Sequence, residues 1–545
     1  MSVERPIVNL NLKTPAGVIF LLAIVCLVAT ALRWFVFDLP LERDEGEYAY
    51  MAQRWLLGEL PYQTTFDQKP PGIIVAYLLL IHFFGLSPAA IHFGAHLYSL
   101  GTLILIFLLG RILFAWQVGF VAAVFAALLL TDPSVFGNAA NTEVFMILPM
   151  VASLIATLLA IRRDNFWWSF ISGILGTLAL LLKQVAIPCI LFNYMLLLWQ
   201  SKRKLQHILA ASGGLLLPLL LTVAYFIAKG AWLPFYDCTI RYNLSYVSAN
   251  LPMDYAKAFL GTTLNIFISV WPVYALALLA VIMECADKGT AKSSSRQHKW
   301  VLFGWLCSSF IGTAIGGNFR QHQFIQIIPA VSLFAALGVN DLVLRFKQNN
   351  LRWAVAFILI IFPITYSLWV NAWYYASGNA LKKVKHCYIG NPFAESIAVA
   401  DFIKQRTKTQ DSIFIFGSEP QIFFYANRRS ASRYIFSYPL MSSSPDVLER
   451  QQSVMHEIAQ NKPIMIITVF CPSSLLIEKK SRREIIDQLA KVLADFYHIV
   501  GVVPMDARNP ALLLKDSAAV AYWTKNSEWY QGQCHSALAI WMRKQ

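Results

Sequence analysis

Residues 41–72 read LERDEGEYAYMAQRWLLGELPYQTTFDQKPPG and lie between two apolar runs, residues 16–37 and 73–86. A polar stretch in this position connects two segments that enter the membrane, so it lies at a membrane surface. The Pro-Pro pair near its end fixes φ and restricts the preceding residue, which stiffens the chain where it returns to the membrane boundary.

The stretch is rich in acidic residues. Asp44, Glu45 and Glu47 precede an amphipathic segment, and Asp67 and Lys69 stand just before the Pro-Pro pair. Acids beside an anionic membrane surface are electrostatically unfavourable unless they bind a cation, a metal or a substrate. The stretch is therefore either a functional loop or a solvated connection, and function is the favoured interpretation.

The composition of the whole chain indicates a membrane protein. Of its 545 residues, 57% are hydrophobic and only 14% are charged, which is more apolar than a soluble domain. The formal charge of +15 comes from short basic clusters between apolar runs, such as SKRK at 201–204 and RFKQNNLR at 345–352. This pattern follows the positive-inside rule and lacks the basic, aromatic-rich face of a nucleic-acid-binding protein.

Spanning helices need about 20 mostly apolar residues. We expect about 11 of them, at residues 16–37, 91–114, 117–132, 143–161, 166–182, 184–200, 207–228, 259–283, 300–317, 322–344 and 353–374. The shorter run 73–86 is predicted to be an interfacial or re-entrant helix. With the N-terminus in the cytoplasm, this arrangement also places the basic loops in the cytoplasm. Counting 73–86 as a twelfth span would place every later basic loop outside the cytoplasm, against the positive-inside rule.

The chain changes character after residue 375. Amphipathic stretches at 394–405, 445–460 and 482–493 alternate with β-rich runs at 412–417, 432–437, 464–470 and 498–503. This alternation predicts a C-terminal α/β domain outside the cytoplasm. We therefore expect a transmembrane domain, 1–375, with a first outer loop at 38–90, and an extracytoplasmic domain, 376–545.

The eight cysteines stand singly, which supports neither a zinc site nor a redox motif. Four of them fall in regions expected outside the cytoplasm, where one disulfide of unassigned pairing is an option: Cys238, Cys387, Cys471 and Cys534.

Other polar residues collect at the outer ends of the expected spans. Glu143 begins the fourth span, where an acid also favours the helix dipole, so capping is an equal alternative. Arg241, Arg320 and His322 suit a lipid phosphate, although each alone is as often an interfacial anchor. Lys183 could likewise bind a lipid phosphate or serve as an interfacial anchor.

Four motifs occur in a characteristic order: RDEGEYAYMAQ, FDQKPPG, NTE and GGNFRQHQFIQIIP. Together they resemble the GT-C glycosyltransferases of the protein O-mannosyltransferase and lipid A aminoarabinose transferase type. The resemblance implies a GT-C fold and inverting transfer from a polyprenyl-phosphate sugar to a lipid, glycan or protein acceptor. It also implies a location at the outer face of a bacterial inner membrane.

The resemblance carries over to particular residues. The first-loop aspartate maps onto Asp44 with Glu45 as its neighbour, and the KPP lysine maps onto Lys69. One departure concerns metal binding, because the aminoarabinose transferases have an acid directly before this lysine, whereas here Gln68 stands there and Asp67 one position earlier. A divalent cation is thus the one cofactor left open.

An inverting displacement needs a single base for the acceptor hydroxyl, and a carboxylate can serve. A leaving phosphate needs positive charge and no general acid, unlike a glycosidase leaving group. We predict Asp44 as the base, with Glu45 beside it in the catalytic group. The other candidate residues are Lys69, Arg241, Arg320 and His322 for the donor phosphate, and Asp67 and Glu143 for the acceptor or a metal.

The rival interpretation is a transporter or flippase of a lipid-linked or small solute. It predicts charged residues at mid-membrane depth, whereas the expected spans are nearly free of acids. The enzyme is therefore favoured, with the membrane lipids as its surroundings and no nucleic-acid partner.

Overall fold

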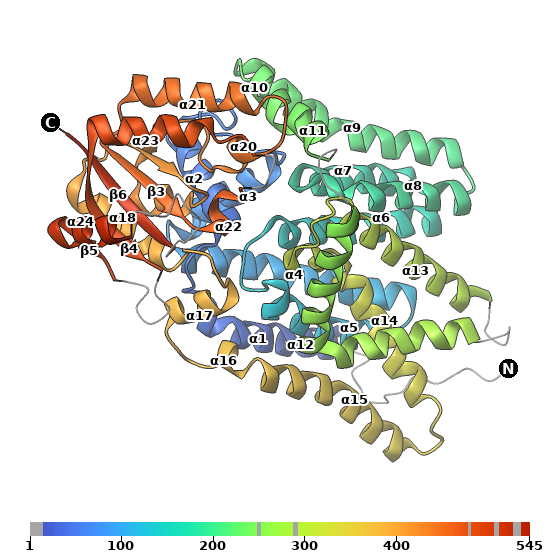
Figure 1. The fold of residues 1–545 in the computed structure, drawn as a ribbon. Coiled ribbons are helices and arrows are strands. Elements are labelled where there is room, and N and C mark those ends of the chain that lie inside the picture. Colours follow the sequence, from blue (N-terminus) through green and yellow to red (C-terminus); the bar gives the residue numbers. More distant parts are fainter. Residues whose placement is uncertain are drawn as a thin grey trace. The chain divides into compact units, whose positions relative to one another are not determined.

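The computed structural model of the chain describes residues 15–247, 252–286, 293–477, 481–505, 512–526 and 536–544. The chain forms two compact units, each assembled from separate segments (Figure 1). The first unit comprises Met1–Phe37, His92–Tyr225 and Asn250–Ser377, and the second comprises Asp38–Ile91, Phe226–Ala249 and Gly378–Gln545. The linear division of the chain at residue 375 stays a prediction.

Long apolar helices make up most of the first unit. They are α1 (Pro15–Arg33), α4 (Pro88–Leu113), α5 (Trp116–Thr131), α6 (Thr142–Arg163), α7 (Phe166–Leu182), α8 (Ile187–Gln200), α9 (Lys204–Ala228), α12 (Pro252–Ala286), α13 (Ser293–Ala314), α14 (Ile328–Val343) and α15 (Asn349–Val370), followed by the short α16 (Ala372–Tyr375).

Each of the eleven expected spans coincides with one of these long helices. Within the described residues, seven helices are long and apolar enough to cross a membrane. The other four are α5, α7 and α8, which are shorter, and α13, whose first turns, SSSRQHK, are polar. The chain is therefore a multi-pass, mainly helical membrane protein.

A buried polar network joins three helices of the first unit. The carboxylate of Asp132, which follows α5, accepts hydrogen bonds from Ser269 Oγ at 2.8 and 2.9 Å, from Ser367 Oγ at 3.1 Å and from Asn371 Nδ2 at 3.2 Å. Ser269 lies in α12 beside the non-helical Val270 (φ −139°, ψ 27°). Because both carboxylate oxygens are satisfied, the network holds α5, the kink of α12 and the end of α15 together.

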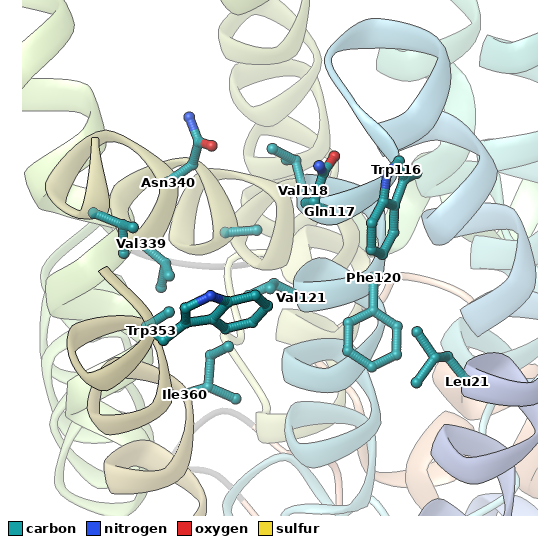
Figure 2. A pocket seen from close by; sticks show the side chains of 13 residues that line it. Leu21, Trp116, Gln117, Val118, Phe120, Val121, Val339, Asn340, Trp353 and Ile360 are labelled. Carbon is teal, nitrogen blue, oxygen red and sulfur yellow. The ribbon is translucent and has the colours of Figure 1, made fainter. Parts of the chain in front are cut away.

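A cavity of about 200 Å³ opens among α1, α5, α14 and α15 of the first unit (Figure 2). Trp116 of α5 and Trp353 of α15 are among its lining residues, as Figure 2 shows. The side chains that line it are mostly aliphatic and aromatic, so it is an apolar cavity.

Helices of the second unit include α2 (Arg43–Leu56), which lies in the acidic stretch, and α3 (Gly72–Phe84), which forms the apolar run after it. The expected short helix at 73–86 is confirmed as α3, which has 13 residues, while its interfacial position stays a prediction. After residue 226 follow α10 (Trp232–Tyr236), a π-helical turn (Asp237–Arg241) and α11 (Tyr242–Val247). The remaining helices are α17 (Ala380–Cys387), α18 (Glu395–Arg406), α19 (Gln421–Ala426), α20 (Tyr438–Met441), α21 (Val447–Asn461), α22 (Pro472–Leu475), α23 (Glu484–Phe496) and α24 (Asp516–Lys525).

A mixed sheet forms the centre of the C-terminal part of the second unit. Its strand order is β2-β1-β3-β6-β4-β5, and β1 pairs in parallel with both β2 and β3, while the other pairs are antiparallel. The strands are β1 (Ser412–Phe416), β2 (Arg429–Ser430), β3 (Met465–Phe470), β4 (Tyr497–Pro504), β5 (Leu514–Lys515) and β6 (Ala537–Arg543). The predicted α/β character is therefore confirmed, as are strands at 412–417, 464–470 and 498–503.

The predicted strand at 432–437 is wrong. In this segment side chains, rather than a neighbouring strand, bind the backbone: Arg433 N donates to Glu457 Oε2 at 3.2 Å and Ser437 N donates to Ser418 Oγ at 3.1 Å. The ring of Tyr434 stacks on Phe66 with centroids 5.2 Å apart. The alternating aromatic pattern that looked like a strand thus serves packing onto the acidic stretch.

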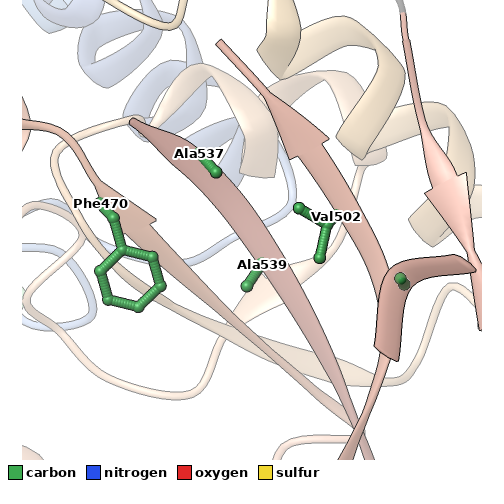
Figure 3. Close-up of a cluster of buried hydrophobic side chains, with 5 residues drawn as sticks. Phe470, Val502, Ala537 and Ala539 are labelled. Atoms are coloured by element: carbon green, nitrogen blue, oxygen red, sulfur yellow. The ribbon is translucent and has the colours of Figure 1, made fainter. Parts of the chain in front are cut away.

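Small residues allow α24 to pack closely on the sheet (Figure 3). Ala519 of α24 meets Phe470, Val502, Ala537 and Ala539, all of which are buried. Because alanine side chains are short, the helix backbone approaches the strands, and apolar area leaves water on both sides of the contact.

Of the four cysteines expected outside the cytoplasm, the structure describes Cys238, Cys387 and Cys471, and these are free thiols. Cys534 lies outside the described residues, so the expectation of one disulfide stays untested for it.

Candidate functional site

The acidic motif begins a helix. Glu45 N donates to Glu42 Oε1 at 3.2 Å, and Glu42 N donates to Glu45 Oε2 at 3.1 Å, which closes a capping box at the start of α2. The expectation that these acids precede the amphipathic helix is therefore wrong, because the capping box starts α2 at Arg43. Glu45 is fully buried and belongs to the capping box, while Asp44 and Glu47 lie on either side of it on the same helix, three residues apart.

A tight turn returns the chain to α2 at Lys69. Lys69 N donates to Asp67 Oδ1 at 3.0 Å, the local bond that aspartate makes in turns. The hydroxyl of the buried Tyr62 donates to Lys69 O at 2.8 Å, and Pro71 then caps the start of α3. The turn directs the lysine amine toward the acids of α2.

Four residues form what we call the lysine–carboxylate cluster: Asp44, Glu47, Asp67 and Lys69. Lys69 Nζ lies 3.5 Å from Glu47 Oε2, 3.7 Å from Asp67 Oδ1 and 3.9 Å from Asp44 Oδ1. It also lies 4.7 Å from the centroid of the Tyr48 ring, a cation–π contact. The side chain of Asp44 is 29% exposed, compared with 4% for Glu47 and 0% for Asp67. Asp44 is therefore the carboxylate of the cluster that an incoming molecule can reach.

The cluster fixes the charge of its members. Burial alone would lower the pKa of the Lys69 amine, but the charges of Asp44, Asp67 and Glu47 outweigh it and raise that pKa well above its usual value. Burial and the charge of Asp67 raise the pKa of Glu47 well above its usual range. The cluster thus favours the charged form of Lys69 and the neutral form of Glu47.

Glu47 and Asp67 each have one buried carboxyl oxygen that differs from the other oxygen of the same group. Glu47 Oε1 and Asp67 Oδ2 are buried and accept no hydrogen bond from the described part of the chain. Burial raises the pKa of Asp67, while the charge of Lys69 and the hydrogen bond from its backbone N–H oppose that rise. The pKa of Glu47 is raised more strongly than that of Asp67, so a proton on this pair is favoured on Glu47.

The cluster does not fit a divalent metal. Within the described ranges, no group of three or more His, Cys, Asp and Glu residues is arranged to hold a metal ion. The ammonium of Lys69 instead lies within 3.9 Å of all three carboxylates and balances part of their charge. The cation that the acidic stretch requires is thus supplied by the chain itself.

A second charged group lies in the first unit, around Glu143 in the first turn of α6. Lys183 Nζ donates to Glu143 Oε1 at 2.5 Å, Thr142 Oγ1 donates to Glu143 Oε2 at 2.9 Å, and His322 Nε2 lies 4.0 Å from Glu143 Oε1. Glu143 is only 1% exposed. It is therefore a buried ion-pair partner as well as a first-turn acid.

The two predicted arginines are surface residues. Arg241 is 62% exposed and forms ion pairs with Asp237 at 3.4 Å and Asp446 at 3.7 Å within the second unit. Arg320 is exposed in the first unit, and its backbone N–H donates to Gln323 Oε1 at 3.1 Å. Both side chains are accessible to an anion, as a role in phosphate binding requires.

Sequence reasoning did not select Glu47, Tyr48 or Tyr62 as site residues. The spacing of three residues between Asp44 and Glu47 would have indicated a shared helix face had the helix start been recognised. Tyr48 follows directly in the motif. Nothing in the sequence marks Tyr62, whose role depends on a turn that brings its hydroxyl to Lys69 O.

Comparison with known proteins agrees with the expected resemblance. Residues 68–227 match the family model described as dolichyl-phosphate-mannose-protein mannosyltransferase. No curated protein matches the chain by sequence.

Solved structures of ArnT and of an archaeal oligosaccharyltransferase share the fold. ArnT from Cupriavidus metallidurans bound to undecaprenyl phosphate aligns with a TM-score of 0.56 at 15% identity, over 84% of this chain and 94% of ArnT. The archaeal oligosaccharyltransferase AglB from Archaeoglobus fulgidus, in complex with an inhibitory peptide and a dolichol-phosphate, aligns with a TM-score of 0.58 at 12% identity, over 98% of this chain and 89% of AglB. The chain therefore has the GT-C fold, and the predicted fold class is confirmed.

Proposed function

We propose that this chain is an integral-membrane inverting glycosyltransferase that moves a sugar from a polyprenyl-phosphate donor to a lipid, glycan or protein acceptor. The family match and the GT-C fold support the class of enzyme. The structures that share the fold hold undecaprenyl phosphate or dolichol-phosphate, which supports the class of donor. The observation that carries the assignment of residues is the cation of Lys69 held 3.9 Å from the accessible carboxylate of Asp44.

In the proposed reaction Asp44 is the base. Its carboxylate takes the proton of the acceptor hydroxyl as that oxygen bonds to the anomeric carbon of the sugar. The bond between the anomeric carbon and the phosphate oxygen breaks, and polyprenyl phosphate leaves with the bonding electrons. Inversion follows because the acceptor attacks opposite the leaving group.

Lys69 stabilises the charge that develops on the leaving phosphate. Its raised pKa keeps the amine protonated, and a fixed cation in a water-poor site stabilises a developing anion. The raised pKa of Glu47 favours its neutral form, which lowers the negative charge around the phosphate. Asp67 then positions Lys69 through the turn and the ion pair.

The residues around Glu143 form the second part of the proposal. Lys183 and His322 bring positive charge to this acid, a combination that suits a phosphate or a sugar hydroxyl. We assign the exposed Arg241 and Arg320 to the donor phosphate.

The proposed location is the bacterial inner membrane, with the N-terminus in the cytoplasm and residues 376–545 in the periplasm. The distribution of basic loops supports this orientation. The transporter alternative is not favoured, because the family and fold comparisons all point to glycosyltransferases.

The test is sugar transfer by membranes that contain the wild type or Asp44→Asn. Radiolabelled polyprenyl-phosphate sugars are supplied as a panel, together with a crude acceptor lysate. Asp401→Asn is the matched control, because Asp401 is 57% exposed on α18. We expect wild type and control to transfer label from one donor, and an equally abundant, folded Asp44→Asn to lose transfer. Undiminished transfer by Asp44→Asn contradicts the assignment of the base.

A further inference from the structure

The cavity of the first unit has features that the proposed reaction does not use. It lies among α1, α5, α14 and α15 and has a volume of about 200 Å³ (Figure 2). Its two tryptophans, Trp116 and Trp353, stand near the first residues of α5 and α15. Tryptophan near the end of a spanning helix marks the level of the lipid headgroups. The cavity therefore opens close to one membrane surface.

One buried amide in this cavity lacks a partner. Gln117 lines the cavity and is 9% exposed, yet neither Nε2 nor Oε1 has a hydrogen-bond partner among the described residues. Asn340, the other polar lining residue, already donates to Asp341 Oδ1 at 3.3 Å. A buried polar group without a hydrogen bond is unfavourable. A hydrogen bond between the Gln117 amide and a bound ligand would remove this cost.

The chain near the cavity is positively charged. Arg345 and Lys347 are exposed shortly after the lining residue Val343, and Arg352 directly precedes Trp353. Asp341 forms an ion pair with Lys299 at 3.3 Å. Lys299 also pairs with Glu284 at 3.0 Å, and Glu284 with Arg296 at 3.8 Å, so these two acids have basic partners of their own. Basic clusters beside an apolar cleft between spanning helices recognise anionic lipid headgroups.

We propose that this cavity binds an anionic glycerophospholipid. An acyl chain lies between the four helices, an ester carbonyl accepts a hydrogen bond from Gln117 Nε2, and the phosphate faces Arg345, Lys347 and Arg352. The ester selects this lipid over a polyprenyl phosphate, whose hydrocarbon chain carries no polar atom below the phosphate. Water fits poorly, because a bound water needs two to four polar partners. The proposal goes beyond the enzymatic function and does not rest on it.

The test is native mass spectrometry of the full-length protein, purified in mild detergent and equilibrated with equal amounts of phosphatidylglycerol and phosphatidylethanolamine. We expect the wild type to retain phosphatidylglycerol roughly tenfold better. Ile360→Trp, which fills the cavity, and Gln117→Leu, which removes the amide, should each lower that retention about tenfold. Ile358→Trp is the matched control, since Ile358 lies on the same helix, is 60% exposed and does not line the cavity. It should behave as the wild type.

A second variant, with substitutions only at exposed residues, tests the proposal without disturbing the fold. The exposed pair Arg345→Gln and Lys347→Gln should abolish the preference for phosphatidylglycerol without changing the melting temperature. Equal retention of the two lipids by the wild type overturns the proposal, and so does full retention by folded Ile360→Trp. Displacement of phosphatidylglycerol by an equal amount of undecaprenyl phosphate overturns it in favour of a polyprenyl site.

Discussion

Gly46 of α2 lies directly against Gln421 of α19, so close that a Cβ on Gly46 would be 2.5 Å from both the backbone N and the Cβ of Gln421. The glycine of the acidic motif thus lets α2 touch the C-terminal segment of the second unit. The neighbouring Arg43 strengthens this contact, because its guanidinium donates to Ser418 O at 2.5 Å and pairs with Glu419 at 3.2 Å. The position of Asp44 therefore depends on residues nearly four hundred positions later.

Substitution of Gly46 by alanine should damage both stability and activity. The added methyl meets backbone atoms of Gln421 that cannot move aside, and overpacking of this kind costs about 1–3 kcal/mol. We expect a lower melting temperature in detergent and a larger loss of transfer than of folded protein, because Asp44 shifts with the helix. Gly261→Ala is the control, since nothing lies within 4 Å of a Cβ there. Equal melting temperatures for both variants would refute the close contact.

The protonation of Glu47 predicts a dependence of stability on pH. Its pKa is raised in the folded protein, so the folded state holds a proton that the unfolded state has released above its usual pKa of about 4.3. The stability that the folded protein gains from protonated Glu47 is complete below that unfolded-state pKa. It is lost as pH rises through the pKa that Glu47 has in the folded protein. Glu47→Gln remains neutral and lacks this dependence.

We therefore expect the wild type to lose melting temperature relative to Glu47→Gln as pH rises from about 4 to about 8. Melting curves of both proteins across that range provide the measurement, and Glu449→Gln on α21 is the control. Parallel curves would mean that Glu47 is ionised in the folded protein.

Much of the fold was predictable because apolar runs and β-rich runs are local signals. Every expected span coincides with a helix, since about 20 apolar residues leave the backbone few alternatives in a membrane. The strand predicted at 432–437 was wrong for the same local reason. Its aromatic residues resemble a strand, but its backbone N–H groups donate hydrogen bonds to distant side chains instead of to a neighbouring strand. Strand β6 was missed because its sequence, ALAIWMR, lacks clear alternation.

The candidate site was predictable to the extent that it is local. Asp44, Asp67 and Lys69 stand within one stretch and meet in one cluster. The pair of Glu143 and Lys183 joins residues that are forty positions apart on different helices, and no spacing rule gives such a contact. The raised pKa of Glu47 could not be predicted from the sequence either, because it depends on burial and on neighbours that only the fold brings together.

The role of Lys69 can be separated from its structural contribution. Lys69→Met removes the positive charge that faces the carboxylates of Asp44 and Asp67, so we expect loss of both stability and transfer. The double variant Lys69→Met with Asp67→Asn removes one buried negative charge and should recover much of the melting temperature. Transfer should remain at least about 100-fold below wild type if Lys69 stabilises the leaving phosphate. Recovery of transfer together with stability would assign Lys69 a purely structural role.

Asp132 offers a prediction for the first unit, where its carboxylate joins α5, α12 and α15. Four side chains donate to it, among them Ser269, Ser367 and Asn371. Asp132→Asn places an amide N–H₂ against these donors, which should cost about 1–3 kcal/mol. Ser269→Ala removes a single donor and should cost only about 1 kcal/mol.

Thermal unfolding in detergent should therefore rank Asp132→Asn well below Ser269→Ala. Because the network holds helices and takes no part in the proposed reaction, transfer per folded molecule should stay close to wild type in both variants. A loss of transfer in fully folded Asp132→Asn would instead place this acid in the reaction, whereas an unchanged melting temperature would show that the carboxylate does not hold the kinked α12.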